Sequence, residues 1–389
     1  MNVVDRTLYG IKERRDRLLR GGINSIPSKF ARFRSEFIGV EQKKYYIVTG
    51  ATKSGKTQFA SFTFLYTPLL YAYEHPDKIR LKVFYYSLEE TPEDVTRRFM
   101  SYLLFEKRGI RVSPTDLESS ANNPIDQKIL DYFQEEDIKP ILDFYEQHVE
   151  FSPSRNPTGV NKEVEDYMRA NGTVHWKKVT IKNEVTGQPM EVSAFDYYEP
   201  NDPDEYVIVI FDHLSLIQSE RGMTLKQTAD KLSEYFVILR NRYGVTPVLI
   251  QQQSFEMESL DAFKEKKLRP TAQGLADTKY TARDCNVLLG IFNPFKHDLP
   301  EYKRYDITQL RDNCRFLEVI LNRGGSSGGL VALFFDGAIC SWYELPRADD
   351  AEELRRVYQY VRALGSEAQA AFAFFMHNVR HVENLLLNE

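Results

Sequence analysis

This sequence has few cysteines, no long apolar run and no excess of positive charge, and each of these features excludes a class of protein. Only 3 of the 389 residues are cysteines, and no two of them form a CxxC pair. Neither a zinc ribbon nor a disulfide framework is therefore predicted, and buried thiols in a reducing compartment are favoured. No apolar stretch reaches the roughly 20 residues of a membrane helix, and the first residues lack a secretory pattern. We expect a cytoplasmic protein with no membrane partner.

The charge balance excludes a broad basic surface of the kind that coats duplex DNA. Lys and Arg number 51 and Asp and Glu 56, which gives a net charge of −5. A local set of lysines and backbone amides can still hold nucleic-acid phosphates in such a chain. Apolar residues make up 42% and charged residues 28%, an ordinary globular mixture. The length then predicts one large α/β domain with additions, or two small domains.

The motif with the most chemical content runs from residue 50 to residue 57 and has the form GxxxxGKT. An apolar strand over 45–49 leads into it, and a helix is predicted from about residue 56. Glycines let backbone N–H groups turn toward a β-phosphate. Lys56 adds a charge between the β- and γ-phosphates, and the Thr57 hydroxyl can bind Mg²⁺. We expect ATP and Mg²⁺ as cofactors, with the nucleotide held by Gly50, Ala51, Thr52, Lys53, Ser54, Gly55, Lys56 and Thr57.

Strands and helices alternate around this P-loop motif and predict a mostly parallel, twisted sheet with helices on both faces and nucleotide at its carboxyl edge. Further strands are expected at 82–86, 206–212, 246–251, 286–292, 316–322, 330–335 and 340–343, and helices from Thr91, capped by that residue with Pro92 next, and over 224–243. Residues 174–197 alternate apolar and polar side chains around a turn, which predicts an inserted β-hairpin. The rest of 109–204 is irregular apart from an acidic helical part over 124–147.

Two carboxylates follow predicted strands at the same edge of the sheet. Asp212 closes a strand that we place beside the P-loop strand, where it can orient Mg²⁺. An ordinary turn or helix-capping role is the alternative. Glu89 follows the strand of 82–86 and can accept a proton from the attacking water. Glu90 competes for that role, and both can instead be charges at a helix N-terminus.

A run of three glutamines, residues 251–253, ends the strand that starts at residue 246. They cannot all face a core, so at least one lies at the sheet edge. A neutral amide there can sense the γ-phosphate and pass its state to the following loop. Gln252 and Gln253 are the candidates, and a solvated strand end without a catalytic role is the alternative.

A later strand ends at Arg323 and runs into the glycine-rich stretch 324–329. Because the P-loop already supplies Lys56, Arg323 is more useful to the nucleotide of a neighbouring subunit, as an arginine finger. A surface arginine beside a glycine hairpin turn is the alternative.

Taken in order, these motifs resemble the motor domain of DnaB-type replicative helicases, which are hexameric, RecA-like ATPases. The resemblance spans about residues 1–345 and rests on the P-loop, Ser87-Leu88-Glu89, the strand with Asp212, the glutamine-ended strand, and Arg323 with its glycine-rich turn. It implies that Glu89 is the catalytic glutamate and Arg323 the finger. The basic amphipathic helix expected over 4–19 has too little core to stand alone and should pack on something, and a solvated arm is the alternative. The resemblance implies that it docks on the next subunit.

The resemblance further implies an ATP-driven replicative helicase that moves along single-stranded DNA, 5′ to 3′. The DNA-binding loop of the family lies between the glutamine-ended strand and the next one, here residues 269–284. Asp277, Thr278 and Lys279 would then face the central channel, and Lys279 is the residue that we expect to contact a phosphate. The implied partners are single-stranded DNA, further copies of the chain in a hexameric ring, and a primase or loader protein.

The sequence also departs from the family pattern. Leu321 stands where the family has a basic residue, the N-terminal collar domain has no counterpart, and the hairpin and the residues after 345 are additions. We expect a reduced, phage-type helicase of a bacterial or phage-infected cell, with a linker helix and arm (1–35), a RecA-like ATPase domain (36–345) and a helical C-terminal extension (346–389). A RecA-fold ATPase that acts as a recombinase, or as a nucleotide-dependent regulator or scaffold without unwinding, is the alternative.

Overall fold

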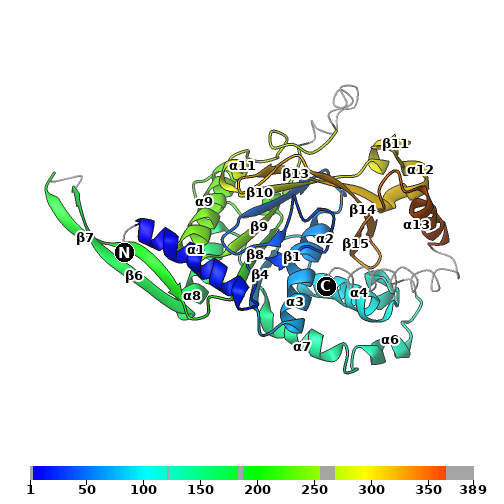
Figure 1. The fold of residues 1–389 in the computed structure, drawn as a ribbon, viewed down its shortest axis with the longest axis horizontal. Helices are drawn as coiled ribbons and strands as arrows, with labels where there is room; N and C mark the ends of the chain where they lie inside the picture. Colours follow the sequence, from blue (N-terminus) through cyan, green and yellow to red (C-terminus); the bar gives the residue numbers. More distant parts are fainter. Residues whose placement is uncertain (1–2, 121, 183–186, 255–267, 365–389) are drawn as a thin grey trace.

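A nine-stranded sheet forms the centre of the molecule (Figure 1). The structure is a computed structural model, and it describes residues 3–120, 122–182, 187–254 and 268–364. The strand order is β15-β14-β13-β10-β3-β9-β8-β4-β5; the strands from β10 to β5 are parallel, and β13, β14 and β15 are added antiparallel. In chain order they are β3 (Tyr46–Gly50), β4 (Arg80–Ser87), β5 (Val149–Phe151), β8 (Glu205–Asp212), β9 (Thr246–Gln252), β10 (Val287–Phe292), β13 (Cys314–Asn322), β14 (Leu330–Asp336) and β15 (Ser341–Glu344).

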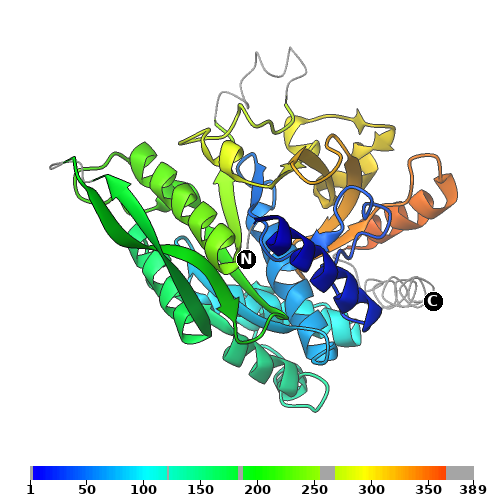
Figure 2. The ribbon, with the colours of Figure 1, turned by 60° about the vertical axis from the view of Figure 1, so that its left-hand side comes forward.

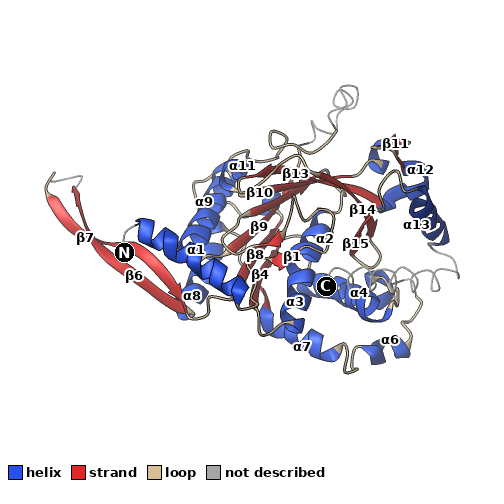
Figure 3. Ribbon diagram, viewed as in Figure 1, coloured by secondary structure: helices blue, strands red, loops and turns tan. Residues whose placement is uncertain are grey.

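Helices cover both faces of this sheet (Figure 3). One face carries α2 (Lys56–Ser61), the π-helical segment Phe62–Tyr66, α3 (Thr67–Glu74), α4 (Pro92–Arg108) and α7 (Lys139–His148), and the other carries α8 (Pro157–Ala170) and α9 (Leu225–Tyr243). Side chains of a strand alternate between the two faces. Tyr46 and Val48 accordingly lie in the first core, and Ile47 lies in the second. Burial on both faces explains why the parallel strands read as continuous apolar runs.

Two of the expected helices begin at a threonine that caps the helix N-terminus. The Thr91 hydroxyl accepts a hydrogen bond from the backbone N–H of Asp94, and Pro92 occupies the first helical position of α4. Thr224 caps α9 in the same way through the N–H of Gln227. Each cap satisfies a backbone donor that has no partner within its helix. The predicted cap at Thr91 is therefore confirmed.

The sheet confirms the predicted α/β fold class, and two details correct the sequence analysis. Asp212 is not on the strand beside the P-loop strand, because β9 lies between β8 and β3. The helical part predicted over 124–147 is confirmed as α6 (Gln127–Tyr132) and α7, but the stretch 109–204 is more regular than predicted, because it also contains α5 (Pro114–Leu117), β5 and α8. The short edge strand β5 and the amphipathic helix α8 follow one another within 22 residues, and neither was expected.

The predicted hairpin is confirmed as a two-stranded ribbon that projects from the body of the molecule (Figure 2). It consists of β6 (Gly172–Lys182) and β7 (Pro189–Pro200), paired antiparallel. Its base is fixed to α9, where the rings of Phe195 and Tyr198 contact Tyr243. Trp176, which lies opposite Phe195 in the β6–β7 pairing, is 54% exposed. A pair of strands of this kind has little core of its own, so its order depends on that base.

The expected N-terminal helix is confirmed as α1 (Val3–Leu19), which lies beside the ribbon (Figures 1 and 2). Ion pairs tie it to the chain: Arg6 to Asp196 at 3.6 Å, Arg14 to Glu41 at 3.5 Å and Arg17 to Asp204 at 3.0 Å. No residue of α1 is buried, and Leu8 and Ile11 are each 60% exposed. The expectation that its apolar side packs on something is therefore not met within the described part of this chain.

The remaining elements complete the surface around the sheet. They are β1 (Ile26–Pro27), β2 (Gly39–Val40), the 3-10 turns Leu214–Leu216, Phe295–His297 and Arg311–Asn313, α11 (Thr281–Asp284), β11 (Glu301–Tyr302), β12 (Tyr305–Asp306), α12 (Ile307–Leu310) and α13 (Ala351–Ala363). Leu354 and Val357 of α13 pack with Phe334 of β14. The rest of the helical extension expected after Pro346, residues 365–389, lies outside the described residues.

The three cysteines behave as the sequence predicts. Cys285, Cys314 and Cys340 are free and buried. Burial raises the pKa of each thiol to about 12, so all three stay protonated and inert near neutral pH. Among the described residues, the helices are all too short or too polar to cross a bilayer.

Candidate active site

The P-loop closes tightly at the carboxyl end of β3, and two glycines make this possible. A Cβ atom on Gly50 would lie 2.5 Å from Ser54 Oγ and 2.6 Å from the carbonyl oxygen of Ile291. Gly55 has φ +95°, and a Cβ there would lie 3.1 Å from the Trp342 ring. Only glycine fits either position without strain. The expected strand, loop and helix are all present around residues 50–57.

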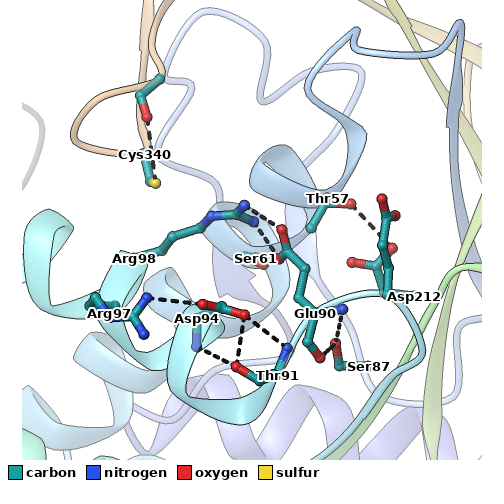
Figure 4. Close-up of polar contacts among 12 residues, drawn as sticks. Thr57, Ser61, Ser87, Glu90, Thr91, Asp94, Arg97, Arg98, Asp212 and Cys340 are labelled. Carbon is teal, nitrogen blue, oxygen red and sulfur yellow. Dashed lines mark hydrogen bonds and ion pairs between the residues drawn. The ribbon is translucent and has the colours of Figure 1, made fainter. Parts of the chain in front are cut away.

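Lys56 and Thr57 begin the helix that follows the loop. Lys56 is buried, with 7% of its surface exposed, and its Nζ donates a hydrogen bond to the Ala51 carbonyl at 2.8 Å. The Thr57 hydroxyl donates to Asp212 Oδ1 at 3.1 Å (Figure 4). The structure thus brings Thr57 and Asp212 together, although one strand separates β8 from β3.

Asp212 is a buried carboxylate with oxygen partners. It is 4% exposed, and the Tyr85 hydroxyl donates to its Oδ2 at 3.3 Å. Burial raises the pKa of Asp212 to about 7, because the charged form loses its hydration there. A hydroxyl and a buried carboxylate side by side are the hard oxygen donors that Mg²⁺ takes up. The pair therefore fits a bound Mg²⁺, and a cation would offset the cost of the buried charge.

The two neighbouring glutamates after β4 have different surroundings. Both carboxylate oxygens of Glu90 accept hydrogen bonds from the Arg98 guanidinium (Figure 4). Burial raises the pKa of Glu90, and Arg98 opposes that rise. The side chain of Glu89 is 63% exposed, and its carboxylate lies 3.5 Å from His213 Nε2. Both oxygens of Glu90 are therefore bonded to Arg98, whereas the Glu89 carboxylate has His213 as its neighbour.

His213, which the sequence analysis missed, lies between Glu89 and the glutamine-ended strand. It is 7% exposed, and its Nε2 is 3.4 Å from Gln252 Nε2. Burial lowers the pKa of His213. A lone histidine after a strand-end aspartate carried no pattern of its own in the sequence. Its contacts join residues 89, 213 and 252, which only the folded sheet brings together.

The three glutamines differ in their burial and in their hydrogen-bond partners. Gln252 is half-buried and contacts His213. Gln253 is buried; its Nε2 donates to the Thr49 hydroxyl at 2.9 Å and its Oε1 accepts from the Thr271 backbone N–H at 3.1 Å. Gln251 is fully buried, and its Nε2 donates to the carbonyls of Ala276 and Thr278. Gln251 and Gln253 attach the end of β9 to the following segment, and Gln252 is the one that contacts His213, the neighbour of Glu89.

The expected DNA-binding segment presents only part of its predicted residues to solvent. Thr278 is buried, and its hydroxyl donates to Asp230 of α9. Asp277, with φ +62°, accepts a hydrogen bond from the Ser215 hydroxyl. Lys279 is exposed. Thr278 therefore shapes the loop from inside, and Lys279 alone of the three offers a cation at the surface.

Tyr280, the next residue, was not singled out from the sequence. Its ring is 47% exposed, and the charged ends of Lys226 and Arg283 lie over it at 4.5 and 4.7 Å from the centroid. A tyrosine next to a lysine in a loop is too common a pair to be noticed. An exposed ring flanked by cations is the kind of group on which bases stack.

Arg323 lies far from the P-loop of its own chain. β10 places Asn322 level with Tyr46, the first residue of β3, whereas Leu317 is level with Gly50 at the P-loop. The six residue-to-residue steps from 317 to 323 span about 20 Å along the strand. The guanidinium instead donates to the backbone carbonyls of Cys285, at 2.9 Å, and of Arg283. It lies at the opposite edge of the sheet from Lys56.

Comparison with known proteins depends on structure alone. No family model matches the sequence, and no curated protein sequence resembles it. A solved structure described as an ATPase domain superposes with a TM-score of 0.61 over 89% of this chain and 100% of that one, at 14% identity. The fold is that of the DnaB-type helicase motor. A DnaB-like replicative helicase, whose structure was described together with its interactions with primase, matches with a TM-score of 0.59 over 88% of this chain and 67% of that one, again at 14% identity.

This likeness confirms the helicase-motor fold that the order of motifs predicted. The strands that lead to the P-loop, to Asp212 and to Glu89 are not all adjacent in the sheet, because β9 lies between β3 and β8. In this fold the P-loop, Asp212 and Glu89 share one sheet edge. Residues 3–120, 122–182, 187–254 and 268–364 contain no cluster of three or more His, Cys, Asp or Glu side chains that could hold a metal ion.

Proposed function

We propose that the protein is an ATP-driven motor that assembles with copies of itself, moves along single-stranded DNA and separates duplex DNA. The observation that carries this proposal is the arrangement of two half-sites at opposite edges of one sheet. The P-loop, Thr57, Asp212 and Glu89 lie at the carboxyl edge, and Arg323 lies at the other. A chain built in this way needs a second copy to complete its site.

In the proposed reaction, the P-loop and Lys56 hold the phosphates and Thr57 and Asp212 hold Mg²⁺. The metal ion would neutralise charge on the β- and γ-phosphates. Glu89 accepts a proton from the attacking water, while Arg98 keeps Glu90 out of that role. Gln252, adjacent to His213 and Glu89, is the side chain best placed to respond to the γ-phosphate.

The DNA-facing part of the proposal rests on residues 277–280. Lys279 supplies a phosphate contact and Tyr280 a ring for base stacking. Gln251 attaches Thr278 of this segment to the strand that ends at the nucleotide site, and Gln253 attaches Thr271, which precedes the segment. Movement at Gln252 would therefore be transmitted to the segment through the two residues on either side of it.

The proposed assembly is a hexameric ring in cytoplasm, with 5′ to 3′ movement and a primase or loader as a further partner. The exposed apolar side of α1 supports a subunit contact at that helix. We also propose the division into an N-terminal arm (1–35), a motor domain (36–345) and a C-terminal extension (346–389). The solved ATPase domain and the DnaB-like helicase, which have the same fold, support the proposal that this protein is an ATP-driven motor.

The test is ATP hydrolysis by the purified protein with and without single-stranded DNA, followed by strand separation on a forked duplex. We expect DNA to stimulate hydrolysis and the fork to open only with ATP and Mg²⁺. Hydrolysis that ignores DNA would support a nucleotide-dependent switch instead, and strand exchange without unwinding would support a recombinase. Nucleotide binding without turnover would indicate a scaffold.

Replacing Lys279 by Ala should remove much of the stimulation by DNA while leaving DNA-independent hydrolysis within about twofold. The reason is that Lys279 is exposed and has no part in the nucleotide site, and one phosphate contact fewer lowers the salt dependence of DNA binding by about one unit of slope. DNA binding at several salt concentrations measures this. Lys303, an exposed lysine on the β11–β12 turn, is the matched control, and an equal loss in Lys303→Ala would contradict the assignment.

A further inference from the structure

One buried arginine contacts the P-loop and has no part in the mechanism described above. Arg315 lies on β13 and is 1% exposed. Its Nε donates a hydrogen bond to the backbone carbonyl of Ser54, in the P-loop, at 2.9 Å. One terminal nitrogen donates to the carbonyls of Asp312 and Cys314 at 2.6 and 3.0 Å, and the other lies 3.0 Å from the Asp312 carboxylate.

Burying a guanidinium is costly unless its donors are satisfied and its charge is balanced. Here all three nitrogens have oxygen partners, and the Phe335 ring lies 5.1 Å from the guanidinium carbon. Asp312, the only acidic partner among them, is itself mostly exposed, with 64% of its side chain accessible. A core at this position needs no charge for packing alone. The other polar partners of Arg315 are on residues 312 and 314 of its own segment, so the bond to Ser54 is the one that joins this arginine to the P-loop.

That contact fixes the orientation of a peptide group. In a trans peptide the carbonyl and the following N–H point in opposite directions. Holding the Ser54 carbonyl toward β13 turns the N–H of Gly55 to the other side, where loops of this kind receive a phosphate. A charged donor on the carbonyl also polarises the peptide, which makes its N–H a stronger donor. Gly55 has the positive φ that this orientation demands.

A second cation acts on the same loop in the same way. Lys296, in the turn after β10, donates from Nζ to the Thr52 carbonyl at 3.0 Å. The N–H on the other side of that peptide belongs to Lys53, whose φ is +59°. Two peptide groups of the P-loop, Thr52–Lys53 and Ser54–Gly55, thus each have their carbonyl oxygen bonded to a basic side chain. One comes from the turn after β10 and the other from β13.

We propose that Arg315 is a positioning residue of the phosphate-binding loop, assisted by Lys296. Both side chains hold P-loop carbonyls outward so that the N–H groups of Gly55 and Lys53 stay directed at the nucleotide phosphates. Arg315 touches no phosphate itself and acts through the backbone. The inference rests on the proposed binding of ATP at this loop, and it adds two residues that the motif GxxxxGKT does not contain.

The test compares binding of ADP and of inorganic pyrophosphate, each with Mg²⁺, by the full chain and by Arg315→Met, Arg315→Lys and Lys296→Met. Loss of one charged hydrogen bond to the loop should weaken both ligands about tenfold in Arg315→Met. Arg315→Lys keeps a cation and should recover most of the affinity. Lys296→Met should weaken binding about threefold without loss of thermal stability, because Lys296 is exposed.

The matched control is Arg111→Met. Arg111 forms a paired contact with the buried Asp336, at 3.0 Å through two nitrogens, and does not contact the P-loop. The substitution Arg111→Met should lower the melting temperature of the protein and leave the affinity of the folded protein for pyrophosphate unchanged. If Arg315→Met lowers stability but binds both ligands as the wild type does, Arg315 is merely structural and the inference is wrong.

The outcomes separate this inference from the proposed function. Absence of ADP binding in the wild type would overturn the proposed function. Wild-type binding together with an unchanged affinity in Lys296→Met overturns the positioning role alone if Arg315→Met fails to fold and the control folds. A loss that is largest in Arg315→Met, about threefold in Lys296→Met and smallest in Arg315→Lys supports it.

Discussion

Replacement of Glu89 by Gln should reduce the rate of ATP hydrolysis by about 10² to 10⁴ and leave ATP binding intact. The amide keeps the size of the side chain but cannot accept the proton of the attacking water. Glu89 is the glutamate with an exposed carboxylate at the site, next to His213 at 3.5 Å. Steady-state hydrolysis with and without single-stranded DNA, alongside equilibrium binding of ATP, measures the two effects separately.

Glu90→Gln is the matched control for that variant, one residue away. Both oxygens of Glu90 accept from Arg98, so this substitution weakens an ion pair at the start of α4 and should change the hydrolysis rate only a few-fold. If Glu90→Gln abolishes hydrolysis while Glu89→Gln does not, the roles of the two glutamates are reversed. Loss of ATP binding in Glu89→Gln would indicate damage to the site rather than loss of a base.

The second large effect is expected for Arg323→Ala, which should lower the rate of hydrolysis by about 10³ to 10⁵ if the finger completes the neighbour's site. The guanidinium lies about 20 Å along the sheet from the P-loop of its own chain. Among the described residues, its hydrogen bonds go to the backbone carbonyls of Cys285 and Arg283. Its loss should therefore leave folding and ATP binding nearly unchanged.

Mixing two inactive variants tests whether Arg323 acts between subunits. Glu89→Gln provides an intact Arg323, and Arg323→Ala provides an intact Glu89. In an equal mixture about a quarter of the interfaces would combine both intact halves, because each interface takes one half from each neighbour. We expect hydrolysis to return on mixing. Two inactive proteins that stay inactive together, although they assemble, would place the finger within its own chain and contradict the proposed assembly.

Local patterns were sufficient to predict most of the fold. The continuous apolar runs before Gly50 and Asp212 mark strands buried on both faces, and Thr91-Pro92 marks the start of α4. The ribbon followed from alternation of apolar and polar residues over 174–197. In each case the signal lies within a few residues of the element that it predicts, so no knowledge of the tertiary structure is needed.

The parts that were wrong or missed depend on contacts between distant residues. The order of strands places β9 between β3 and β8, and nothing in either strand specifies its neighbour. A role for His213 is indicated only by the folded structure, in which Glu89 and Gln252 lie beside it. Arg315 lies 261 positions from its P-loop partner, and in the sequence it stands just before the strand predicted over 316–322. Thr278 likewise turned out to face α9 through Asp230 rather than solvent.

The chain contains only two tryptophans, and their surroundings could hardly differ more. Trp342 is 1% exposed, stacks on Phe335 with 4.3 Å between ring centroids, and lies against the Gly55 position of the P-loop. Trp176 stands on the ribbon with more than half of its surface in solvent. Each indole is thus a built-in fluorophore for one part of the molecule. Phenylalanine at one of the two positions leaves a single tryptophan, whose emission reports either on the phosphate-binding loop or on whatever covers the ribbon, without any added label.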